Sequence, residues 1–322
     1  MRPVRIGVVG VGRFGRLHAR TLAGIAEAEL VALVVRDPSQ RAAIGHELPG
    51  VPIWGDLSAA LAQSAAEAWV VATQTASHVD LAEQILRAGA AVLVEKPLGL
   101  TVAEAQRLAP LVAPDSRNFM VGHILLFAPE FRRLAREAQQ RGGLAYVSAE
   151  RHRPIGVYEL FHGESPLRLV MVHDLYLALV LAGGAEPTRM QASLHPRPGG
   201  GCDLALARLE WADGLWVALS ASYFTPPGMG SDGFDRLEAY GRGWVARMEI
   251  NPQPLTIWAE RAEWPLALAI DDDPAAPSGW LAEELRCFCR VVRGAEPPLG
   301  ARYEDGLRIM EWLDRLEQSA ES

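Results

Sequence analysis

The sequence predicts an α/β protein of two domains, and three observations support that prediction. The chain has 322 residues, which is long for one domain, and its 49% apolar and 22% charged content is that of a globular protein. Residues 1–122 alternate short apolar runs with amphipathic stretches. After Gly122 the pattern changes to longer segments of alternating polarity, bounded by glycine and proline. We therefore expect a helix-covered parallel sheet over residues 1–122 and an α+β domain with a large, mostly antiparallel open sheet over residues 123–322.

Four apolar runs in the first domain have the length of buried strands. They are Arg5–Val9, Leu30–Val35, Trp69–Ala72 and Ala91–Val94. Helix-like stretches lie between them, among them Arg13–Ala26 and His78–Ala88, and Gly89 is a typical residue to end the second of these helices. Continuous apolar strands that alternate with helices are typical of a parallel sheet buried on both faces.

In the second domain, a helix-like stretch at Glu130–Gln140 precedes six segments with the alternation of strands. They are Ala145–Arg151, Arg189–Leu194, Leu204–Trp211, Leu215–Tyr223, Phe234–Tyr240 and Trp244–Ile250. A further helix is expected at Leu167–Leu181, between the first two strands. Two terminal helices, Trp280–Arg293 and Glu304–Ser319, could pack back onto the first domain.

Composition argues against several classes of protein. A formal net charge of -8 disfavours a nucleic-acid partner, because such binding depends on lysine and arginine at phosphates. The first apolar stretch, Val4–Val11, is too short for a membrane span or a signal segment. Three cysteines and scattered histidines match neither a disulfide framework nor a zinc site, so no metal is predicted. We expect a cytoplasmic protein.

A glycine-rich turn, Gly10–Gly15 (GVGRFG), directly follows the first strand and opens the first helix. In this context Gly10 permits a tight turn, Gly12 lets the backbone approach a pyrophosphate, and Gly15 lets the helix pack on the strand. The helix N-terminus then offers free N–H groups to the phosphates. The turn predicts a Rossmann dinucleotide-binding domain. The alternative is a glycine-rich turn without a ligand.

The second strand ends in Arg36-Asp37, where a dinucleotide-binding domain usually places the group that contacts the adenosine ribose. Asp37 could accept the ribose hydroxyls, or Arg36 could pair with a 2′-phosphate. The alternative is that both are ordinary turn residues before Pro38.

A more specific signal stands at Glu95-Lys96-Pro97, after the fourth apolar run. This segment resembles the Glu-Lys-Pro motif of the Gfo/Idh/MocA oxidoreductases. The resemblance covers essentially the whole chain. It is carried by Gly10–Gly15, Glu95–Pro97, Thr73–His78, Val121–His123, His173–Asp174, the Trp280–Phe288 helix and the Tyr303–Asp305 helix start.

The resemblance implies a Rossmann domain followed by an open mixed sheet, with a nicotinamide over Lys96 and a sugar, inositol or related polyol as substrate. Oxidation of a secondary alcohol removes a hydroxyl proton as hydride leaves, and a cation such as Lys96 stabilises the developing alkoxide. The alternative for Lys96 is a strand-end lysine that faces water.

His173 is the expected acid/base, since histidine titrates near neutral pH. In the family an aspartate one helical turn earlier commonly assists this histidine, but Leu169 holds that position here. Asp174 or a loop group could replace it, so we include Asp174 among the predicted catalytic residues. The alternative is a His173 that only packs beneath the pocket.

Matching the second strand to the family places Val35 where NAD-preferring members carry aspartate, and Arg36 where NADP-preferring members often carry arginine. This favours NADP over NAD as the cofactor. The predicted cofactor-binding residues are Gly10, Gly12, Arg13, Phe14, Gly15, Arg36, Asp37, Thr73, His78, Glu95, Lys96 and His123. The predicted substrate-binding residues are Lys96, Arg151, Tyr158, Arg168 and His173, with Arg153 and His162 in the same donor-rich region.

Two functions remain open at this point. The first is hydride transfer between NAD(P) and a carbohydrate-like alcohol or ketone. The second is a regulatory or sensor protein that binds the nucleotide without turnover, suggested by Leu169 at the carboxylate position. In either case we expect a homodimer or homotetramer formed through the second sheet, whose strands carry several large apolar residues. These include Trp211, Trp216, Trp244 and Trp258.

Overall fold

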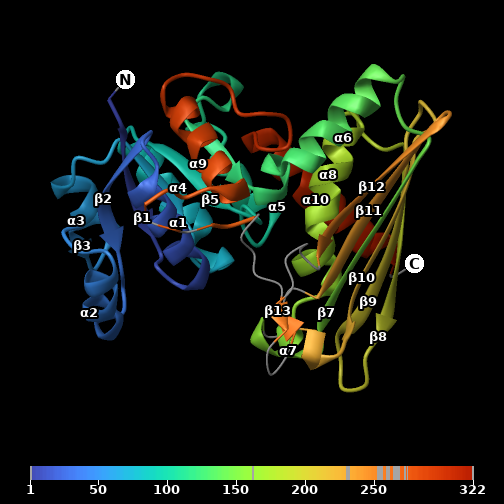
Figure 1. The fold of residues 1–322 in the computed structure, drawn as a ribbon, viewed down its shortest axis with the longest axis horizontal. Helices are drawn as coiled ribbons and strands as arrows, with labels where there is room; N and C mark the ends of the chain where they lie inside the picture. The colour runs from blue at the N-terminus through green and yellow to red at the C-terminus, as the bar shows by residue number, and fades with distance from the viewer. Residues whose placement is uncertain are drawn as a thin grey trace. The chain divides into compact units, whose positions relative to one another are not determined.

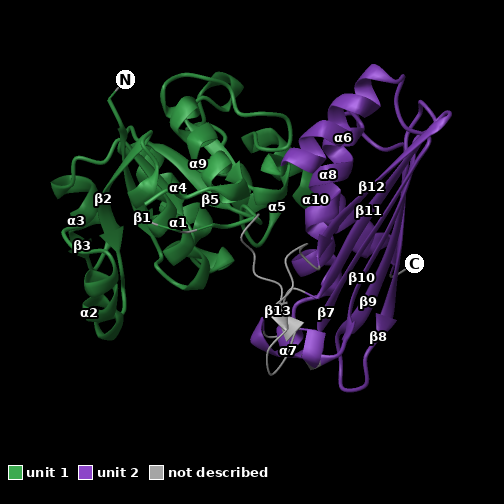
Figure 2. Cartoon of the chain, in the orientation of Figure 1, with its two compact units in different colours: residues 1–128, 267–310 green, residues 129–266, 311–322 purple. Residues whose placement is uncertain are grey.

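The structure is a computed structural model. It describes residues 2–161, 163–229, 233–251, 257–258, 262–263, 269–271, 273 and 275–320. The chain divides into two compact units, and each unit combines two stretches of sequence (Figure 2). Unit 1 comprises Met1–Ala128 and Ala267–Met310, and unit 2 comprises Pro129–Leu266 and Glu311–Ser322. The functional division that we placed at residue 122 stays a prediction.

Unit 1 is built on a six-stranded sheet in which every pairing is parallel. Its strands are β1 (Val4–Val9), β2 (Ala28–Val34), β3 (Ile53–Trp54), β4 (Ala68–Val71), β5 (Ala91–Glu95) and β6 (Phe119–Gly122). The strand order β3-β2-β1-β4-β5-β6 is that of a Rossmann fold, which confirms the expected fold class. Sequence analysis predicted neither β6 nor β3, and the two-residue edge strand β3 exists only through its pairing with β2.

Helices separate these strands in the chain (Figure 1). They are α1 (Arg13–Gly24), α2 (Pro38–Glu47), α3 (Leu57–Gln63), α4 (His78–Arg87) and α5 (Val102–Gln106). A further helix of unit 1, α9 (Gly279–Val292), comes from the second stretch of sequence. Gly89 ends α4 as expected: its φ is +79° and its amide donates to the carbonyl of Leu86. Trp69 and Phe119 are among the largest fully buried side chains of the sheet.

Unit 2 is built on a second six-stranded sheet, in the order β12-β11-β7-β10-β9-β8. Its strands are β7 (Tyr146–Pro154), β8 (Arg189–Pro196), β9 (Cys202–Glu210), β10 (Trp216–Thr225), β11 (Phe234–Gly241) and β12 (Trp244–Asn251). The central pair β7–β10 is parallel and the other pairs are antiparallel, so the sheet is mixed and mostly antiparallel, as expected.

Helices of unit 2 cover one face of this sheet, where α6 (Pro129–Gln140) and α8 (Val172–Leu181) lie side by side (Figure 1). A short helix, α7 (Ile155–Leu160), follows β7, and a π-helical turn over Leu167–Met171 leads into α8. The last helix, α10 (Tyr303–Ala320), belongs to unit 2 from residue 311 onward.

The other face of the second sheet carries exposed aromatic residues. Tyr240, Tyr146 and Trp216 are paired across β11, β7 and β10, and each is more than a third exposed. Trp211 does not belong to this face, contrary to our grouping of the tryptophans: it is 5% exposed, its ring packs against Trp312, and its Nε1 donates to a backbone carbonyl. Trp244 is half-buried, and the side chain of Trp258 lies outside the described residues.

Among the residues that the structure describes, no helix combines the length and the apolar character that a membrane span requires.

Candidate functional site

The predicted cofactor residues lie along one edge of the parallel sheet in unit 1. Register pairs place the ends of five strands at the same level of the sheet. The residues at this level are Val34 of β2, Val9 of β1, Val71 of β4, Val94 of β5 and Val121 of β6. The strand order reverses between β1 and β4, and ligands of open parallel sheets bind outside the carboxyl ends of the strands at such a point.

The turn after β1 has the shape that a pyrophosphate requires. Gly10 has a φ of +84°, and a Cβ there would lie 2.4 Å from Cγ2 of Thr73, which follows β4. A Cβ on Gly15 would lie 1.8 Å from the carbonyl oxygen of Gly10, so only glycine lets α1 pack this closely. Gly12, which caps α1, has no atom within 4 Å of a Cβ position, and Arg13 beside it is exposed. The open backbone at Gly12 and the N-terminus of α1 fit a dinucleotide phosphate.

At the end of β2, Arg36 and Asp37 differ in how the protein uses them. The carboxylate of Asp37 accepts hydrogen bonds from the backbone and hydroxyl of Ser39 and from Gln40. Asp37 thereby caps the N-terminus of α2. The hydrogen bonds from the Ser39 hydroxyl and amide, helped by Gln40 and Arg41, lower the pKa of Asp37. Arg36 is exposed, and within the described residues its guanidinium makes no hydrogen bond or ion pair. The guanidinium of Arg36 is therefore the more available of the two groups.

Lys96 follows β5 and is half-buried. The loop that carries Lys96 is held by a hydrogen bond between His78 and Pro97. The two ring nitrogens of His78 lie 2.8 Å from the carbonyl oxygen of Pro97 and 3.1 Å from that of Thr73. His78 is 1% exposed, as is His123 after β6. His78 thus joins the loop that follows β4 to the loop that carries Lys96. Its predicted contact with the cofactor stays a prediction, and so does that of His123.

Glu95 is the partner of two residues that sequence analysis missed, His18 on α1 and Glu284 on α9. The Nε2 atom of His18 donates to Oε1 of Glu95 at 2.8 Å, and His18 and Glu284 are both 0% exposed. A signal for Glu284 exists in the sequence, because it lies four residues from Trp280 and from Phe288, on the apolar face of its helix.

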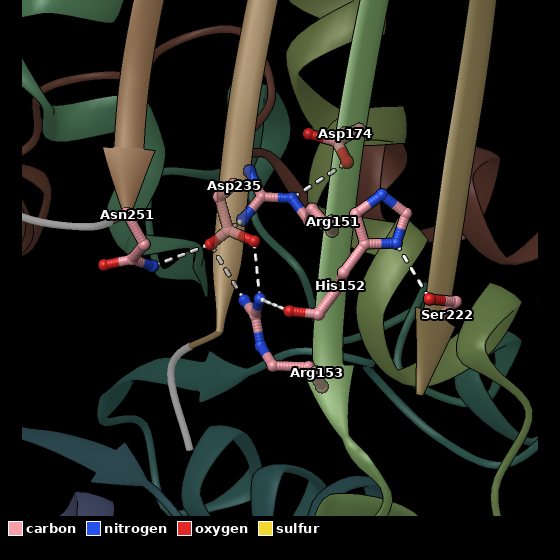
Figure 3. Close-up of polar contacts among 7 residues, drawn as sticks. All are labelled: Arg151, His152, Arg153, Asp174, Ser222, Asp235 and Asn251. Carbon is pink, nitrogen blue, oxygen red and sulfur yellow. Dashed lines mark hydrogen bonds and ion pairs between the residues drawn. The ribbon is translucent and has the colours of Figure 1, made fainter. Parts of the chain in front are cut away.

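Three of the residues predicted in unit 2, Arg151, Arg153 and Asp174, belong to a buried network of ion pairs (Figure 3). Arg151 of β7 donates through Nε to Asp174 of α8 at 2.8 Å and through Nη1 to Asp235 of β11 at 3.1 Å. Arg153 donates to both oxygens of Asp235, at 2.5 and 2.8 Å, and Asn251 of β12 donates to Asp235 at 2.8 Å. These bonds tie three strands of the sheet to the first turn of α8.

The two carboxyl groups of this network have opposite pKa shifts. Burial raises the pKa of Asp174 to about 6, although Arg151 acts in the other direction. Burial alone would also raise the pKa of Asp235, but Arg151 and Arg153 together hold it below its usual value. Asp235 is therefore ionised throughout the neutral range, whereas Asp174 exchanges its proton near pH 6.

Sequence reasoning placed Arg151 at the substrate, and its burial argues against that contact. Arg151 is 2% exposed, since it lies on the same face of β7 as Val147 and Ala149. By the same alternation Asp235 shares a face with Leu237 and Ala239 on β11. The alternation of polarity was thus the signal that pointed to this inward pair.

The other predicted substrate residues of unit 2 also contact the protein. Arg168 forms ion pairs with Asp314 and Glu317 of α10. Tyr158 lies under the guanidinium of Arg197, with 4.6 Å between that group and the ring centroid, and its hydroxyl reaches the backbone of Gly200. His162 lies outside the described residues.

His173 is half-buried in the first turn of α8, directly before Asp174. Leu169 lies in the π-helical turn that precedes α8, so the structure offers no carboxylate at that position. π-Helical turns are rare in proteins as a whole, but those that occur are often found at functional sites.

Comparison with known proteins adds independent evidence. Residues 4–123 match the model of an oxidoreductase family with an NAD-binding Rossmann fold, GFO_IDH_MocA. The UDP-N-acetylglucosamine 3-dehydrogenase of Acidithiobacillus ferrooxidans is 31% identical over 220 residues, which cover 68% of this chain and 67% of that protein. The inositol 2-dehydrogenase of Rhizobium meliloti is 28% identical over 265 residues, which cover 79% and 78%.

Solved structures agree over the full length of the chain. The crystallised UDP-N-acetylglucosamine 3-dehydrogenase GnnA from Acidithiobacillus ferrooxidans gives a TM-score of 0.80 at 26% identity and covers 100% of this chain and 99% of its own. GenD2 from gentamicin A biosynthesis, solved in complex with NAD, gives a TM-score of 0.80 at 23% identity, with 100% and 95% covered. At that identity GenD2 supports the fold alone.

Proposed function

Because the chain belongs to the Gfo/Idh/MocA family of NAD-binding Rossmann oxidoreductases, we propose that it is a dehydrogenase or reductase acting on a secondary alcohol or ketone of a sugar, inositol or related polyol. The named relatives are dehydrogenases of an inositol and of a nucleotide-linked sugar. Sequence identities near 30% support the class of substrate but do not identify an individual compound.

The observation that carries this proposal is the identity of residue 96. The chain has 31 basic residues, and Lys96 is the only lysine among them. It follows β5 at the edge where the glycine turn would hold the cofactor. Everywhere else this chain uses arginine, so a primary amine at residue 96 points to chemistry that a guanidinium does not supply. An amine is a compact charge whose proton can leave, whereas a guanidinium stays protonated.

In the proposed reaction the bound nicotinamide accepts or supplies hydride at the substrate carbon. Lys96 holds positive charge beside the reacting oxygen and stabilises it as an alkoxide. His173 takes the hydroxyl proton, or returns it in the reverse direction. Asp174 acts through His173 as a positioning residue, since its bond to Arg151 fixes the first turn of α8.

We further propose that Arg36 gives the protein a preference for NADP over NAD. The support is the available guanidinium of Arg36 and the use of Asp37 as the cap of α2. Titration of both oxidised nucleotides into wild type and Arg36→Ala tests this. The variant should lose about tenfold in affinity for NADP and little for NAD; equal losses for both nucleotides would contradict the assignment.

A second candidate function is a nucleotide-binding sensor without turnover, which Leu169 in place of a carboxylate favours. One experiment separates the two. Reduced-nicotinamide absorbance is followed across a panel of inositols, sugars and nucleotide-linked sugars with wild type and Lys96→Met. Turnover that Lys96→Met abolishes supports the enzyme. Saturable nucleotide binding without turnover on any substrate supports the sensor.

A further inference from the structure

His18, Glu95 and Glu284 form a buried cluster inside unit 1, behind the residue that carries the proposed chemistry. They come from α1, β5 and α9, and one nitrogen or carboxylate atom of each lies within 4.8 Å of the other two. His18 and Glu284 are fully buried, and the side chain of Glu95 is 14% exposed. The backbone of Lys96 follows that of Glu95 directly.

Glu95 sits in a slot that holds its carboxyl group in place. A Cβ on Gly122 of β6 would lie 2.9 Å from Oε1 of Glu95, so the carboxyl group occupies the space that a side chain would need. The hydrogen bond from His18 at 2.8 Å fixes the same oxygen. The conformation of Glu95, and with it the backbone entering Lys96, is therefore set from two sides.

Among the residues that the structure describes, no Lys or Arg side chain balances the carboxyl group of Glu284. Neither of its oxygens makes a hydrogen bond of normal geometry within the described chain. The groups that act on it are Glu95 from β5, His18 from α1 and the backbone amide of His123 after β6. Burial raises the pKa of Glu284 well above its usual value and the charge of Glu95 raises it further, while the amide of His123 lowers it in part. A second negative charge at this place is unfavourable.

A bound metal ion could neutralise the charges of Glu95 and Glu284. The geometry of the His18 ring instead favours a proton in this cluster. The contact of His18 with Glu95 has the length of a direct hydrogen bond. The Nδ1 atom of His18 is buried without a partner among the described residues, whereas a metal-bound imidazole normally donates its second ring nitrogen to an acceptor.

We propose that Glu284 carries a proton in the folded protein and that, together with His18, it fixes Glu95 and thereby positions Lys96. His18 and Glu284 are positioning residues, and this part of the proposal rests on the proposed role of Lys96. Ionisation of Glu284 would place its charge against that of Glu95 and loosen the segment that leads into Lys96.

The proton on Glu284 is tested by stability against pH, which needs no substrate. An acid whose pKa is raised by folding keeps its proton while the unfolded chain loses it, so wild type loses stability as pH rises from about 4.5. Glu284→Gln removes that loss. Its melting temperature relative to wild type should rise by about 2–4 °C between pH 5 and pH 9. The matched control is Glu283→Gln, at the neighbouring carboxylate that pairs with Arg286 on the helix surface, which should show no such trend.

Two results would contradict the proposal that Glu284 carries a proton. One is a difference between Glu284→Gln and wild type that stays constant with pH. The other is a stoichiometric metal in elemental analysis of the purified protein that Glu284→Gln loses.

The positioning of Lys96 is tested by NMR, because the chain has a single lysine. Protein labelled with [ε-¹³C]lysine gives one lysine signal, so its shift and titration report on Lys96 alone. His18→Leu and Glu284→Leu should change that signal, whereas Glu284→Gln, which resembles the protonated acid, should change it much less. His18→Gln, which keeps a donor towards Glu95, should restore most of it, and Glu283→Gln should leave it as in wild type. A signal indifferent to His18 and Glu284 would overturn the positioning role.

Kinetics then separates failure of this inference from failure of the proposed function. In an active enzyme, His18→Leu should lower kcat about tenfold, with the nucleotide Kd changed less than about twofold and most of the kcat recovered in His18→Gln. An unchanged kcat would count against the positioning role. If no substrate is turned over, the enzyme proposal fails, while the stability and NMR results still decide the inference.

Discussion

The two units use buried and exposed groups in opposite ways. The carboxyl edge of unit 1 offers an open backbone at Gly12, while one of its buried carboxyl groups, Glu284, has no Lys or Arg partner among the described residues. In unit 2 the buried carboxylate of Asp235 is surrounded by Arg151, Arg153 and Asn251. Both carboxyl groups are almost fully buried, yet the pKa of Glu284 is raised and that of Asp235 is lowered. Neighbouring cations, and not burial alone, decide which buried acid stays charged.

Among the tests of this comparison between the two units, we expect the largest effect from a substitution of Asp235. Asp235→Asn leaves Arg151 and Arg153 close together with one carboxyl partner fewer, so the free energy of unfolding should fall by about 3–5 kcal/mol. Chemical denaturation followed by tryptophan fluorescence measures it. Glu238→Gln, on the other face of the same strand, should change stability by less than about 0.5 kcal/mol. A small effect of Asp235→Asn would mean that the network is not energetically important.

Lys96 should show the reverse behaviour, with a large effect on rate and little on stability. Lys96→Met removes the charge proposed to stabilise the alkoxide, so kcat should fall about 10²–10³-fold. The nucleotide Kd and the melting temperature should stay close to those of wild type. Lys96→Arg is the control that keeps the charge and changes its geometry. A loss of nucleotide affinity as large as the loss of kcat would show that Lys96 serves binding instead.

Asp174 sharpens the comparison because it is a buried acid whose pKa is raised by burial although Arg151 and Arg153 both lower it. Its pKa of about 6 lies above the usual 3.8, so its contribution to stability is complete below pH 3.8 and is lost as pH rises through 6. Relative to Asp174→Asn, wild type should therefore lose on the order of 2 kcal/mol of stability between pH 4 and pH 7. Asp213→Asn, an exposed change, should show no such slope. A difference independent of pH would contradict the raised pKa.

Gly12 should show a smaller effect, confined to nucleotide binding. A Cβ at this position meets no atom within 4 Å, so Gly12→Ala should leave the free protein as stable as wild type. The methyl group would instead meet the pyrophosphate, and the nucleotide Kd should rise at least about tenfold. Thermal shift with and without nucleotide measures both. A destabilised free protein, or an unchanged Kd, would contradict the proposed cradle.

The exposed face of the second sheet gives a further prediction, that of a homodimer or homotetramer. Tyr240, Tyr146 and Trp216 form an aromatic row on that face. Size exclusion with light scattering should give a multiple of 35.0 kDa for wild type. Trp216→Glu should shift the mass towards a single chain. A wild-type particle of one chain would refute the prediction.

Patterns that are local in sequence predicted most of the fold. The glycine spacing and the alternation of strands and helices each occupy a few dozen residues. They were sufficient for the Rossmann fold class, for four of the six strands of its sheet and for the six strands of unit 2. The sequence did not predict which residues far apart in the chain form pairs. His18 meets Glu95 77 residues away, and Arg151 meets Asp235 84 residues away. A single sequence does not show such partners, so it did not reveal that the guanidinium of Arg151 is paired inside the protein; its contact with the substrate stays a prediction.

The assembly of unit 1 from two stretches of chain has a consequence for biosynthesis. The ribosome completes the first stretch at residue 128, but α9 follows only after all of residues 129–266 have been made. At about 5–20 residues per second, α9 emerges roughly 10–30 seconds later. During that interval Glu284 has not yet been made, so His18 and Glu95 lack the third member of their buried cluster. The newborn chain therefore passes through a stage in which part of its apolar interior is open to chaperones and proteases.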